Sequence, residues 1–405
     1  MSESPIAEIF RHHFDSFVQR NGALTSDHYK VAHAIRECKT ENMGSHVYSC
    51  PECNHELTIY NSCRNRHCPQ CQAYASAQWV EQRIEELLPV QYFHVVFTIP
   101  EQLNPFALRN KKVFYSLMFR AVSETIKELG ENRKFLGGTT GFIAILHTWG
   151  SNLLDHPHIH CIVPGGALSK DHSRWIDSHT DYLFPAPVMR TLFRGKLMAY
   201  FKDAVAKKSI VLHGTLQQYE EHRLMQNLIN TLYNTEWVVY AKPSFANAEA
   251  VIKYLGSYTH RIAISDRRIK EVNQSTGSVT FTYKDYKREM RLKMTISCEE
   301  FIRRFMLHVV PAGFMRIRHF GFLSNRLQKT LLAVCKKLLL DSEEKSESDT
   351  KVSPVHWYDI IKRITGKDPL VCQECKKGEN GTYRNDRPEE KVDLDSGGNT
   401  LKLRM

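Results

Sequence analysis

The sequence predicts an α+β protein in which a zinc ribbon precedes a larger domain with a central antiparallel sheet and flanking helices. Two CxxC pairs lie close together near the N-terminus, which indicates the ribbon. Beyond them, short segments rich in β-branched and aromatic residues alternate with longer segments that carry apolar residues at helical spacing. With 405 residues, the chain is long enough for two or three domains.

Helices are expected where apolar residues follow a helical rhythm or where a cap and a stop signal bound a segment. These segments are residues 3–40, 73–88, 104–130, 187–207, 217–235, 298–308 and 327–340, with one more helix after Asn247. Strands are expected where β-branched and aromatic residues cluster, at residues 91–100, 141–150, 156–166, 237–243 and 278–286.

These elements predict four regions along the chain. Residues 1–88 form a helical and zinc-binding region, and residues 89–290 form the sheet domain, with a helical insertion at about residues 185–235. Residues 291–340 form a helical, basic region. The polar run DSEEKSESDTKVSP then begins a linker and flexible tail, residues 341–405.

The net charge of +11 favours a polyanionic partner. Basic side chains gain affinity for nucleic acid because they displace counterions from the phosphates. The alternative is a generic basic protein with a solvated surface. No apolar run reaches the roughly 18 residues of a membrane span, and the N-terminus does not have the pattern of a secretory signal, so a cytoplasmic protein is expected.

Four cysteines have the spacing of a structural zinc site. Two CxxC knuckles, CPEC and CPQC, are separated by fourteen residues. Each knuckle places two thiolates on one tight turn, and together they complete a closed tetrahedron around Zn²⁺. The module is therefore expected to bind DNA rather than to catalyse a reaction, and its predicted zinc ligands are Cys50, Cys53, Cys68 and Cys71.

Other potential ligands leave alternatives open. Cys38, Cys63 and His67 could supply an alternative ligand or a second, incomplete site, or they could be free thiols and a phosphate-facing histidine. A further CxxC, at Cys372 and Cys375, has no partner knuckle in the sequence. We therefore interpret it as a partial metal motif at best.

A histidine-rich strand predicts a second, catalytic metal site. In DHPHIHCIVPGG, His156, His158 and His160 occupy alternate positions, which share one face of a strand. A site with two histidines leaves coordination positions open for a phosphate oxygen and accepts Mg²⁺ or Mn²⁺. We take His158 and His160 as ligands. The third ligand stays open between His147 and His156, and His94 on the first strand is more distant in sequence.

A pair of tyrosines could provide a nucleophile. In KYLGSYTHR, Tyr254 and Tyr258 are four residues apart, so on a helix they share a face roughly 6 Å apart. A phenol oxygen can attack a phosphodiester when a metal ion draws charge off the phosphorus. The alternative is that the tyrosines only pack, and that Gly256 ends the helix before Tyr258.

Several arginines are expected to contact DNA phosphates. They are Arg64 and Arg66 at the tip of the ribbon, and Arg261, Arg267 and Arg268 next to the tyrosines. The basic stretch GFMRIRHFGFLSNR at residues 313–326 is either another phosphate-contacting surface or a structural block.

Together these segments resemble the two-tyrosine HUH transposases of rolling-circle insertion sequences. The resemblance covers roughly residues 5–330 and runs in order through NSCRNRHCPQCQ, FHVVFTIP, HPHIHCIVPGG, WVVYAKPSF, YLGSYTHRIAISDRR and FMRIRHFGFLSNR. It implies an N-terminal transposase zinc-binding domain and a catalytic HUH domain at residues 89–290. It also implies that His158-Ile159-His160 is the HUH element and that Tyr254 and Tyr258 are the nucleophiles.

The resemblance implies a DNA transposase with structural Zn²⁺ and catalytic Mg²⁺ or Mn²⁺. Such an enzyme nicks single-stranded transposon ends, forms a 5′-phosphotyrosine, frees a 3′-OH and transfers the strand without ATP. One alternative is a zinc-ribbon DNA-binding protein or an inactive transposon relic. Another is a replication initiator or relaxase with the same chemistry, although the sequence contains no GxxxxGK[ST] loop of a helicase.

Overall fold

The computed structural model describes residues 4–84, 86–179, 182–244, 256, 262–285, 288–340, 356–377 and 382–386. Three predicted site residues, Tyr254, Tyr258 and Arg261, lie outside the described residues, as does most of the helix expected after Asn247. Within the tyrosine segment, Gly256 is described.

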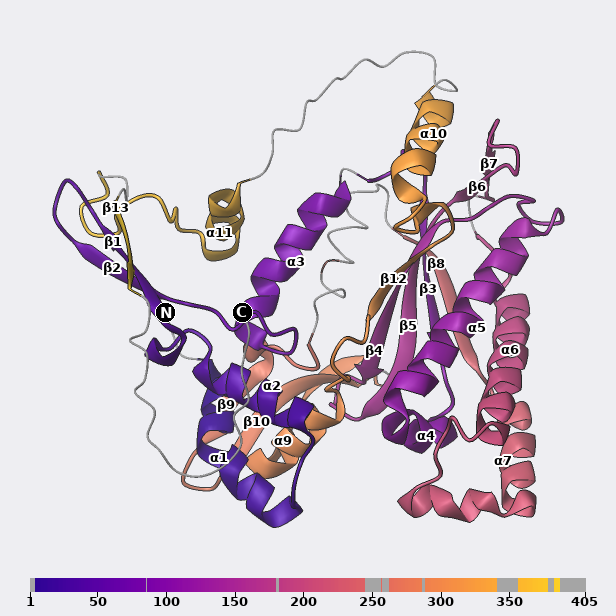
Figure 1. Cartoon of the computed structure of the whole chain (residues 1–405), viewed down its shortest axis with the longest axis horizontal. Helices are drawn as coiled ribbons and strands as arrows, with labels where there is room; N and C mark the ends of the chain where they lie inside the picture. Colours follow the sequence, from indigo (N-terminus) through magenta and orange to yellow (C-terminus); the bar gives the residue numbers. More distant parts are fainter. Residues whose placement is uncertain are drawn as a thin grey trace.

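The larger domain is built on a five-stranded antiparallel sheet with the strand order β12-β4-β5-β3-β8 (Figure 1). This sheet confirms the predicted α+β class. Four of its strands coincide with predicted segments, whereas β12 lies in the basic stretch, where no strand is predicted. The strands are β3 (Tyr92–Thr98), β4 (Phe142–Trp149), β5 (Asp155–Pro164), β8 (Val238–Ser244) and β12 (Ile317–Phe320).

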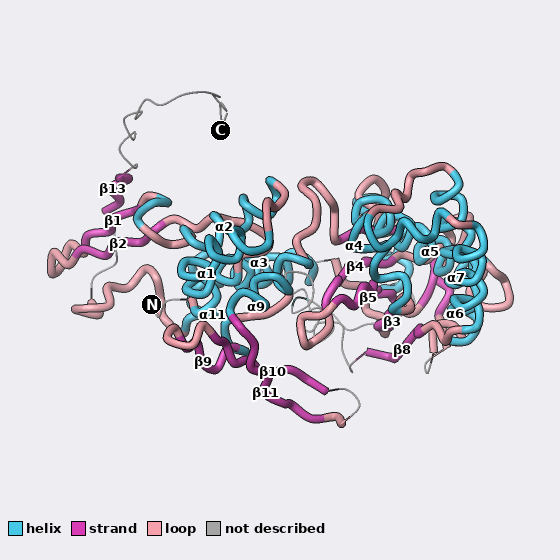
Figure 2. Tube along the Cα trace, turned by 90° about the horizontal axis from the view of Figure 1, so that it is seen from below, coloured by secondary structure: helices cyan, strands magenta, loops and turns pink. Residues whose placement is uncertain are grey.

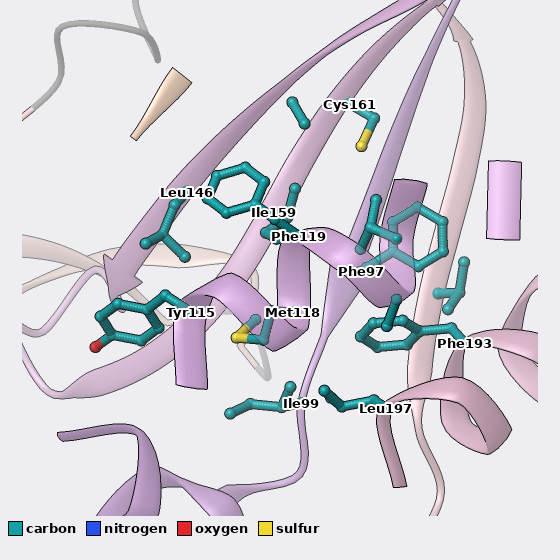
Figure 3. Close-up of a cluster of buried hydrophobic side chains, with 14 of the residues drawn as sticks. Phe97, Ile99, Tyr115, Met118, Phe119, Leu146, Ile159, Cys161, Phe193 and Leu197 are labelled. Atoms are coloured by element: carbon teal, nitrogen blue, oxygen red, sulfur yellow. The ribbon is translucent and has the colours of Figure 1, made fainter. Parts of the chain in front are cut away.

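One face of this sheet carries the main hydrophobic core. Side chains alternate between the two faces of a strand, so Phe97 on β3 and Leu146 on β4 lie on the same face as Ile159 between them on β5. All three side chains are buried. Figure 3 shows that residues from two helices close over this face, namely Tyr115, Met118, Phe119, Phe193 and Leu197.

Four helices cover this core, namely α4 (Asn104–Arg109), α5 (Lys111–Glu131), α6 (Ala186–Ala206) and α7 (His222–Asn234). α5 packs along α6, and α6 reaches the edge strand β8 (Figure 1). Asn110 separates α4 from α5, since its side chain donates to the Phe106 carbonyl and accepts from the Val211 amide. The single helix expected at residues 104–130 is therefore two helices.

The opposite face of the sheet is covered at one end by α3 (Pro69–Ile84) and α10 (Gln328–Leu340). Ile145 and Ile162 pack there with Phe322 of the short helix η5 (Gly321–Leu323). Gly141 permits this close packing, because a Cβ atom at that position would lie 2.5 Å from the Phe322 ring. The other end of this face carries histidines.

A second core joins the N-terminal helices to residues 262–309. α1 and α2 pack with α9 and a three-stranded sheet of order β11-β10-β9. Ser4, the N-cap of α1, accepts from the Ala7 amide and donates to Asp266 at 2.9 Å. The boundaries predicted at residues 88 and 290 thus divide segments that share one core. The elements are α1 (Pro5–Asn21), α2 (Ser26–Glu37), η4 (Asp266–Arg268), β9 (Ile269–Asn273), β10 (Ser278–Asp285), β11 (Met290–Ser297) and α9 (Cys298–Leu307).

Part of the expected tail belongs to the fold. α11 (Trp357–Thr365) packs against α3, and β13 (Thr382–Asp386) pairs with β1 (Ser45–Ser49), which in turn pairs with β2 (Glu56–Tyr60). Figure 2 shows this small sheet at the end of the molecule opposite α5, α6 and α7. Residues 356–377 and 382–386 therefore return to the N-terminal region instead of forming a free tail.

Short elements connect these parts. They are η1 (Glu41–Met43), η2 (Glu101–Leu103), the β6–β7 pair (Gly166–Leu168 and Trp175–Asp177) and η3 (Gly214–Glu220). None of the helices in the described part of the chain is both long and apolar enough to cross a membrane.

The burial of Ile159 predicts a large loss of stability on truncation. Ile159 is fully buried, so Ile159→Ala should lower the free energy of unfolding by about 2–5 kcal/mol, because it leaves a cavity beneath Phe97 and Leu146. Denaturant unfolding followed by circular dichroism measures this change. Val238→Ala is the control, because Val238 is 53% exposed on β8, and it should cost less than about 0.5 kcal/mol. Equal losses in the two variants would contradict this packing.

Candidate metal centre

Three histidines meet because of the pairing between β4 and β5. His147 on β4 lies directly opposite His158 on β5, and His160 follows two residues later on the same face. Ile159 points from between them into the main core, which holds the strand in place. The structure thus brings His147 together with His158 and His160. His147 is one of the two residues that the sequence offered as the third ligand.

The three imidazoles are close enough to share one ion. Their ring centroids are 4.6 Å apart for His147 and His160, 4.7 Å for His158 and His160, and 5.4 Å for His147 and His158. One nitrogen from each ring lies within 4.8 Å of the others. Nitrogens bound at right angles to a cation about 2.1 Å away would be about 3 Å apart, so binding would draw the rings closer.

Hydrogen bonding assigns a tautomer to His158. Its Nδ1 donates to the carbonyl oxygen of His156 at 2.5 Å. A carbonyl oxygen only accepts, so Nδ1 carries the proton and Nε2 keeps its lone pair for a metal ion. His156 thus contributes its backbone, while its exposed side chain lies outside the group of three.

His94 orients His160 in the same way. Nε2 of His94 lies 2.8 Å from Nδ1 of His160, and the two rings stack at 11°. Burial lowers the pKa of His94 to about 4, so its ring is neutral near pH 7 and can accept a hydrogen bond from His160. Such a contact leaves Nε2 of His160 as the ligand atom. His94 falls on this face because it shares one side of β3 with Val96 and Thr98, which lie opposite His160 and His158 on β5.

The chemistry of this donor set fits a catalytic cation. Three neutral imidazole ligands would hold one side of a metal ion and would leave coordination positions for substrate oxygens. His147 and His160 are buried, at 3% and 6% exposure, and His158 reaches 9%. The ring of His147 also stacks on Trp149 at 4.7 Å, which restricts its orientation. The site is therefore preorganised by rigid strands.

The middle of the tyrosine segment contacts α3. Gly256 accepts a hydrogen bond from the Ser76 hydroxyl at 2.5 Å. A Cβ atom at Gly256 would lie 2.0 Å from Cγ2 of Val80, so only glycine fits there. Tyr254 and Tyr258 themselves lie outside the described residues.

The four predicted zinc ligands do not meet in a single site. Cys68 and Cys71 group with Cys38 and Cys63, while the CPEC pair groups with the C-terminal CxxC. The prediction of one site from Cys50, Cys53, Cys68 and Cys71 is therefore wrong in its pairing. The reason is the β1–β2 hairpin: the CPEC turn joins its two strands at the tip, and five residues of strand separate that tip from the base.

The first cysteine group lies at the base of the hairpin. Sγ of Cys71 is 3.6 Å from Sγ of Cys38 and from Sγ of Cys63. Thiolates around tetrahedral Zn²⁺, with bonds of about 2.3 Å, are about 3.8 Å apart. The Cys63 amide also points at Sγ of Cys38 at 3.5 Å. Cys38 and Cys63, whose roles the sequence left open, thus complete a set with Cys68 and Cys71.

His67 does not face phosphates. It is 6% exposed, and its pKa is well below the usual value, because burial and the nearby charges of Arg316 and Arg66 disfavour protonation. His67 also lies outside both cysteine groups. It is a buried residue at the junction between the zinc module and the sheet domain.

Two of the arginines expected to contact DNA are engaged inside the protein. Arg66 donates to three backbone carbonyls at residues 310–314, at 2.5–3.2 Å, and burial lowers its pKa. Arg268 donates to the carbonyl of Thr282 at 2.8 Å and to that of Ser151. These bonds tie loops together, and the phosphate contacts expected of Arg66 and Arg268 stay a prediction. Two others expose their side chains, Arg64 and Arg267.

The choice of third ligand can be tested by metal binding. His147→Ala removes one imidazole of the group, so Mn²⁺ affinity should fall by about tenfold or more. His156→Ala keeps the backbone carbonyl that orients His158, so its Mn²⁺ affinity should match the wild type. Isothermal titration calorimetry measures both. The opposite ranking of the two variants would assign the third position to His156.

Known proteins provide an independent comparison. Residues 141–330 match a family model described as "Putative transposase", and residues 9–99 match one described as "Transposase zinc-binding domain". The chain is 42% identical over 375 residues to "Putative transposase y4qJ" of Sinorhizobium fredii, which covers 92% of this chain and 93% of that protein. No solved structure matches it significantly.

A more distant relative is also a transposase. The chain is 24% identical over 371 residues to the "Transposase for insertion sequence element IS801" of Pseudomonas savastanoi pv. phaseolicola, which covers 87% of this chain and 83% of that protein. The zinc-binding match contains the first cysteine group, and the transposase match contains the three histidines. The chain belongs to the IS91/IS801 family of transposases and carries an N-terminal transposase zinc-binding domain.

Proposed function

We propose that this transposase nicks single-stranded DNA at transposon ends with a tyrosine and transfers the strand by a rolling-circle mechanism. The observation that carries the proposal is the group of His147, His158 and His160 on two paired strands. A cation held there would polarise the non-bridging oxygens of the scissile phosphate and offset the negative charge of the transition state.

The protein's own residues supply the nucleophile and the geometry. The phenol oxygen of Tyr254 or Tyr258 loses its proton and bonds to phosphorus, and the bond from phosphorus to the 3′ oxygen breaks. The products are a 5′-phosphotyrosine and a free 3′-OH. A second tyrosine on the same segment can accept a second strand end in turn. Gly256, between the two tyrosines in sequence, contacts α3 through Ser76 and Val80.

A basic groove offers a path for the DNA strand. A cavity of about 610 Å³ lies between α3, α5 and β12, and the cations that line it are Arg83, Lys112 and Arg318. None of its described lining residues is acidic. Trp79 also lines the groove, where its largely buried ring lies beneath the guanidinium of Arg83. Trp79 and Arg83 lie on α3, the same helix whose Ser76 contacts Gly256.

The basic stretch is partly structural and partly lines this groove. Arg316 is buried and Leu146 donates to its backbone carbonyl, which extends the pairing of β12 with β4. Arg318 instead lies over the Phe119 ring at 4.2 Å and lines the groove. Arg316 thus has a structural role, and the position of Arg318 in the groove supports the phosphate-contacting role proposed for this stretch.

The alternatives predict different outcomes. A zinc-ribbon DNA-binding protein or an inactive relic would bind DNA without covalent chemistry. A replication initiator or relaxase would share the chemistry, but the family matches of this chain are to transposases. The presence of a covalent intermediate is therefore the decisive observation.

Trapping the intermediate tests the proposal. We expect the full chain, mixed with a labelled single-stranded transposon end and Mn²⁺, to form a denaturation-resistant adduct. Mass spectrometry of the digested adduct should locate it at Tyr254 or Tyr258. The double variant Tyr254→Phe/Tyr258→Phe should form none. His158→Ala should also form none while still binding the DNA, because it loses a metal ligand and no DNA contact.

Tyr240→Phe is the matched control, since Tyr240 is an exposed tyrosine on the edge strand β8. It should form as much adduct as the wild type. An undiminished adduct in the double variant would refute the nucleophile assignment. Wild-type protein that binds the strand but forms no adduct would favour the DNA-binding alternative.

The groove has its own test. Lys112 is exposed on the groove side of α5, so Lys112→Ala should weaken single-stranded DNA binding and reduce the slope of log affinity against log salt by about 0.7. Fluorescence anisotropy over a salt series measures both effects. Lys208→Ala, an exposed lysine after α6, should leave the slope unchanged. Equal slopes in all three proteins would exclude the groove as the strand path.

A further inference from the structure

The C-terminal CxxC, which has no partner knuckle in sequence, meets the CPEC turn in space. Sγ of Cys50 is 3.7 Å from Sγ of Cys375, and Sγ of Cys53 is 3.7 Å from Sγ of Cys372. All four sulfur atoms lie within 4.8 Å of one another. The two 3.7 Å separations equal, within about 0.1 Å, the spacing of four thiolates around a tetrahedral Zn²⁺.

The two turns also have the same backbone conformation. The amide of Asn54 donates to the Cys50 carbonyl at 2.9 Å, and the amide of Lys376 donates to the Cys372 carbonyl at 3.1 Å. Asn54 and Lys376, each directly after the second cysteine of its pair, have φ values of 55° and 58°. Side chains other than glycine rarely adopt this conformation. Two matching turns thus present their thiolates to each other like the halves of a zinc ribbon.

The first cysteine group repeats this feature. Lys39 follows Cys38 with φ of 60°, and Arg64 follows Cys63 with φ of 51°. Residues with positive φ other than glycine are uncommon, and in the described chain half of the eight directly follow a cysteine of the two groups. The shared conformation indicates that both groups are built for the same purpose.

The small sheet that carries these turns lies outside the large hydrophobic cores of the described chain. None of the described residues of β1, β2 or α11 belongs to the three hydrophobic clusters of the protein. α11 and β13 are held by backbone pairing with β1, by packing on α3 and by the ion pair of Arg363 with Glu81, and Ile360 of α11 is buried. An exposed ion pair contributes at most about 1 kcal/mol. A metal ion is the stabilising element that such a small unit needs.

We propose that Cys50, Cys53, Cys372 and Cys375 form a second structural zinc site, which fastens the C-terminal segment to the N-terminal hairpin. The zinc module is then built from both ends of the chain. Figure 1 shows the yellow C-terminal elements α11 and β13 beside the purple α3 and β1–β2 hairpin. The family match to the zinc-binding domain ends at residue 99, so it does not include Cys372 and Cys375.

This site has a structural consequence for the rest of the protein. Zinc bound there closes a loop from Cys53 to Cys372 that contains the whole sheet domain. It holds α11 against α3, the helix whose other side chains line the basic groove and contact Gly256. The C-terminal segment thereby becomes a support for α3.

Zinc counting on the purified full chain tests the proposal. We expect about two zinc ions per wild-type chain by inductively coupled plasma mass spectrometry, one for each four-cysteine group. The variant Cys372→Ser/Cys375→Ser should hold about one. About one zinc ion should also remain in Cys50→Ser/Cys53→Ser and in the variant with all four substitutions. The reason is that Cys50, Cys53, Cys372 and Cys375 would share one ion.

Two further measurements separate the loss of this zinc ion from a general loss of structure. Cys335→Ala, at a buried cysteine outside both groups, should keep the wild-type zinc content. Hydrogen exchange of residues 356–377 should rise in Cys372→Ser/Cys375→Ser, while exchange in α5 stays unchanged, which shows that the sheet domain remains folded. A wild-type zinc content in Cys372→Ser/Cys375→Ser, or unchanged exchange of residues 356–377, would overturn the proposal.

Discussion

The metal centre depends on the pairing between β4 and β5. In this register His147 lies opposite His158, and Leu146 and Ile159 point together into the main core. A slip of one residue would turn His147 to the other face and expose Leu146 to the histidine side. The hydrophobic core that fixes the register therefore also fixes the ligand geometry. Ile159, between the two histidines of β5, therefore helps to hold them in register with His147.

α3 joins the zinc module to the sheet domain. Cys68 and Cys71 lie at its start, Ser76 and Val80 contact Gly256, and Arg83 lines the basic groove. A structural zinc ion at the base of this helix would hold its orientation, because two of the four thiolates belong to its first turn and its N-terminal flank. The zinc module thus holds the helix that contacts Gly256 and lines the basic groove.

Local patterns were sufficient to predict much of the fold. The period-two alternation of His158 and His160 identifies β5 correctly. Runs of β-branched and aromatic residues identify β3, β4 and β8. His147 could be proposed because it lies near the end of the strand that precedes β5. By contrast, β12 has only four residues and a basic composition, so it gives no strand signal.

Long-range contacts could not be predicted in the same way. The pairing of Cys53 with Cys372 spans 319 residues of sequence separation, and cysteine spacing alone does not report which knuckles meet. Arg66 and Arg268 lie in basic segments that suggest phosphate contacts, but their guanidinium groups donate hydrogen bonds to backbone carbonyls elsewhere in the protein. Local sequence identifies a reactive group, whereas tertiary packing decides what it binds.

The proposed chemistry depends on one cation held by imidazoles of β4 and β5. Crystals of the full chain grown with Mn²⁺ and measured at the manganese absorption edge test this most directly. The predicted result is an anomalous-difference peak bonded to Nε2 of His158, Nε2 of His160 and one nitrogen of His147. A peak held by other side chains, or no peak among these three rings when Mn²⁺ is bound elsewhere in the protein, would contradict the account.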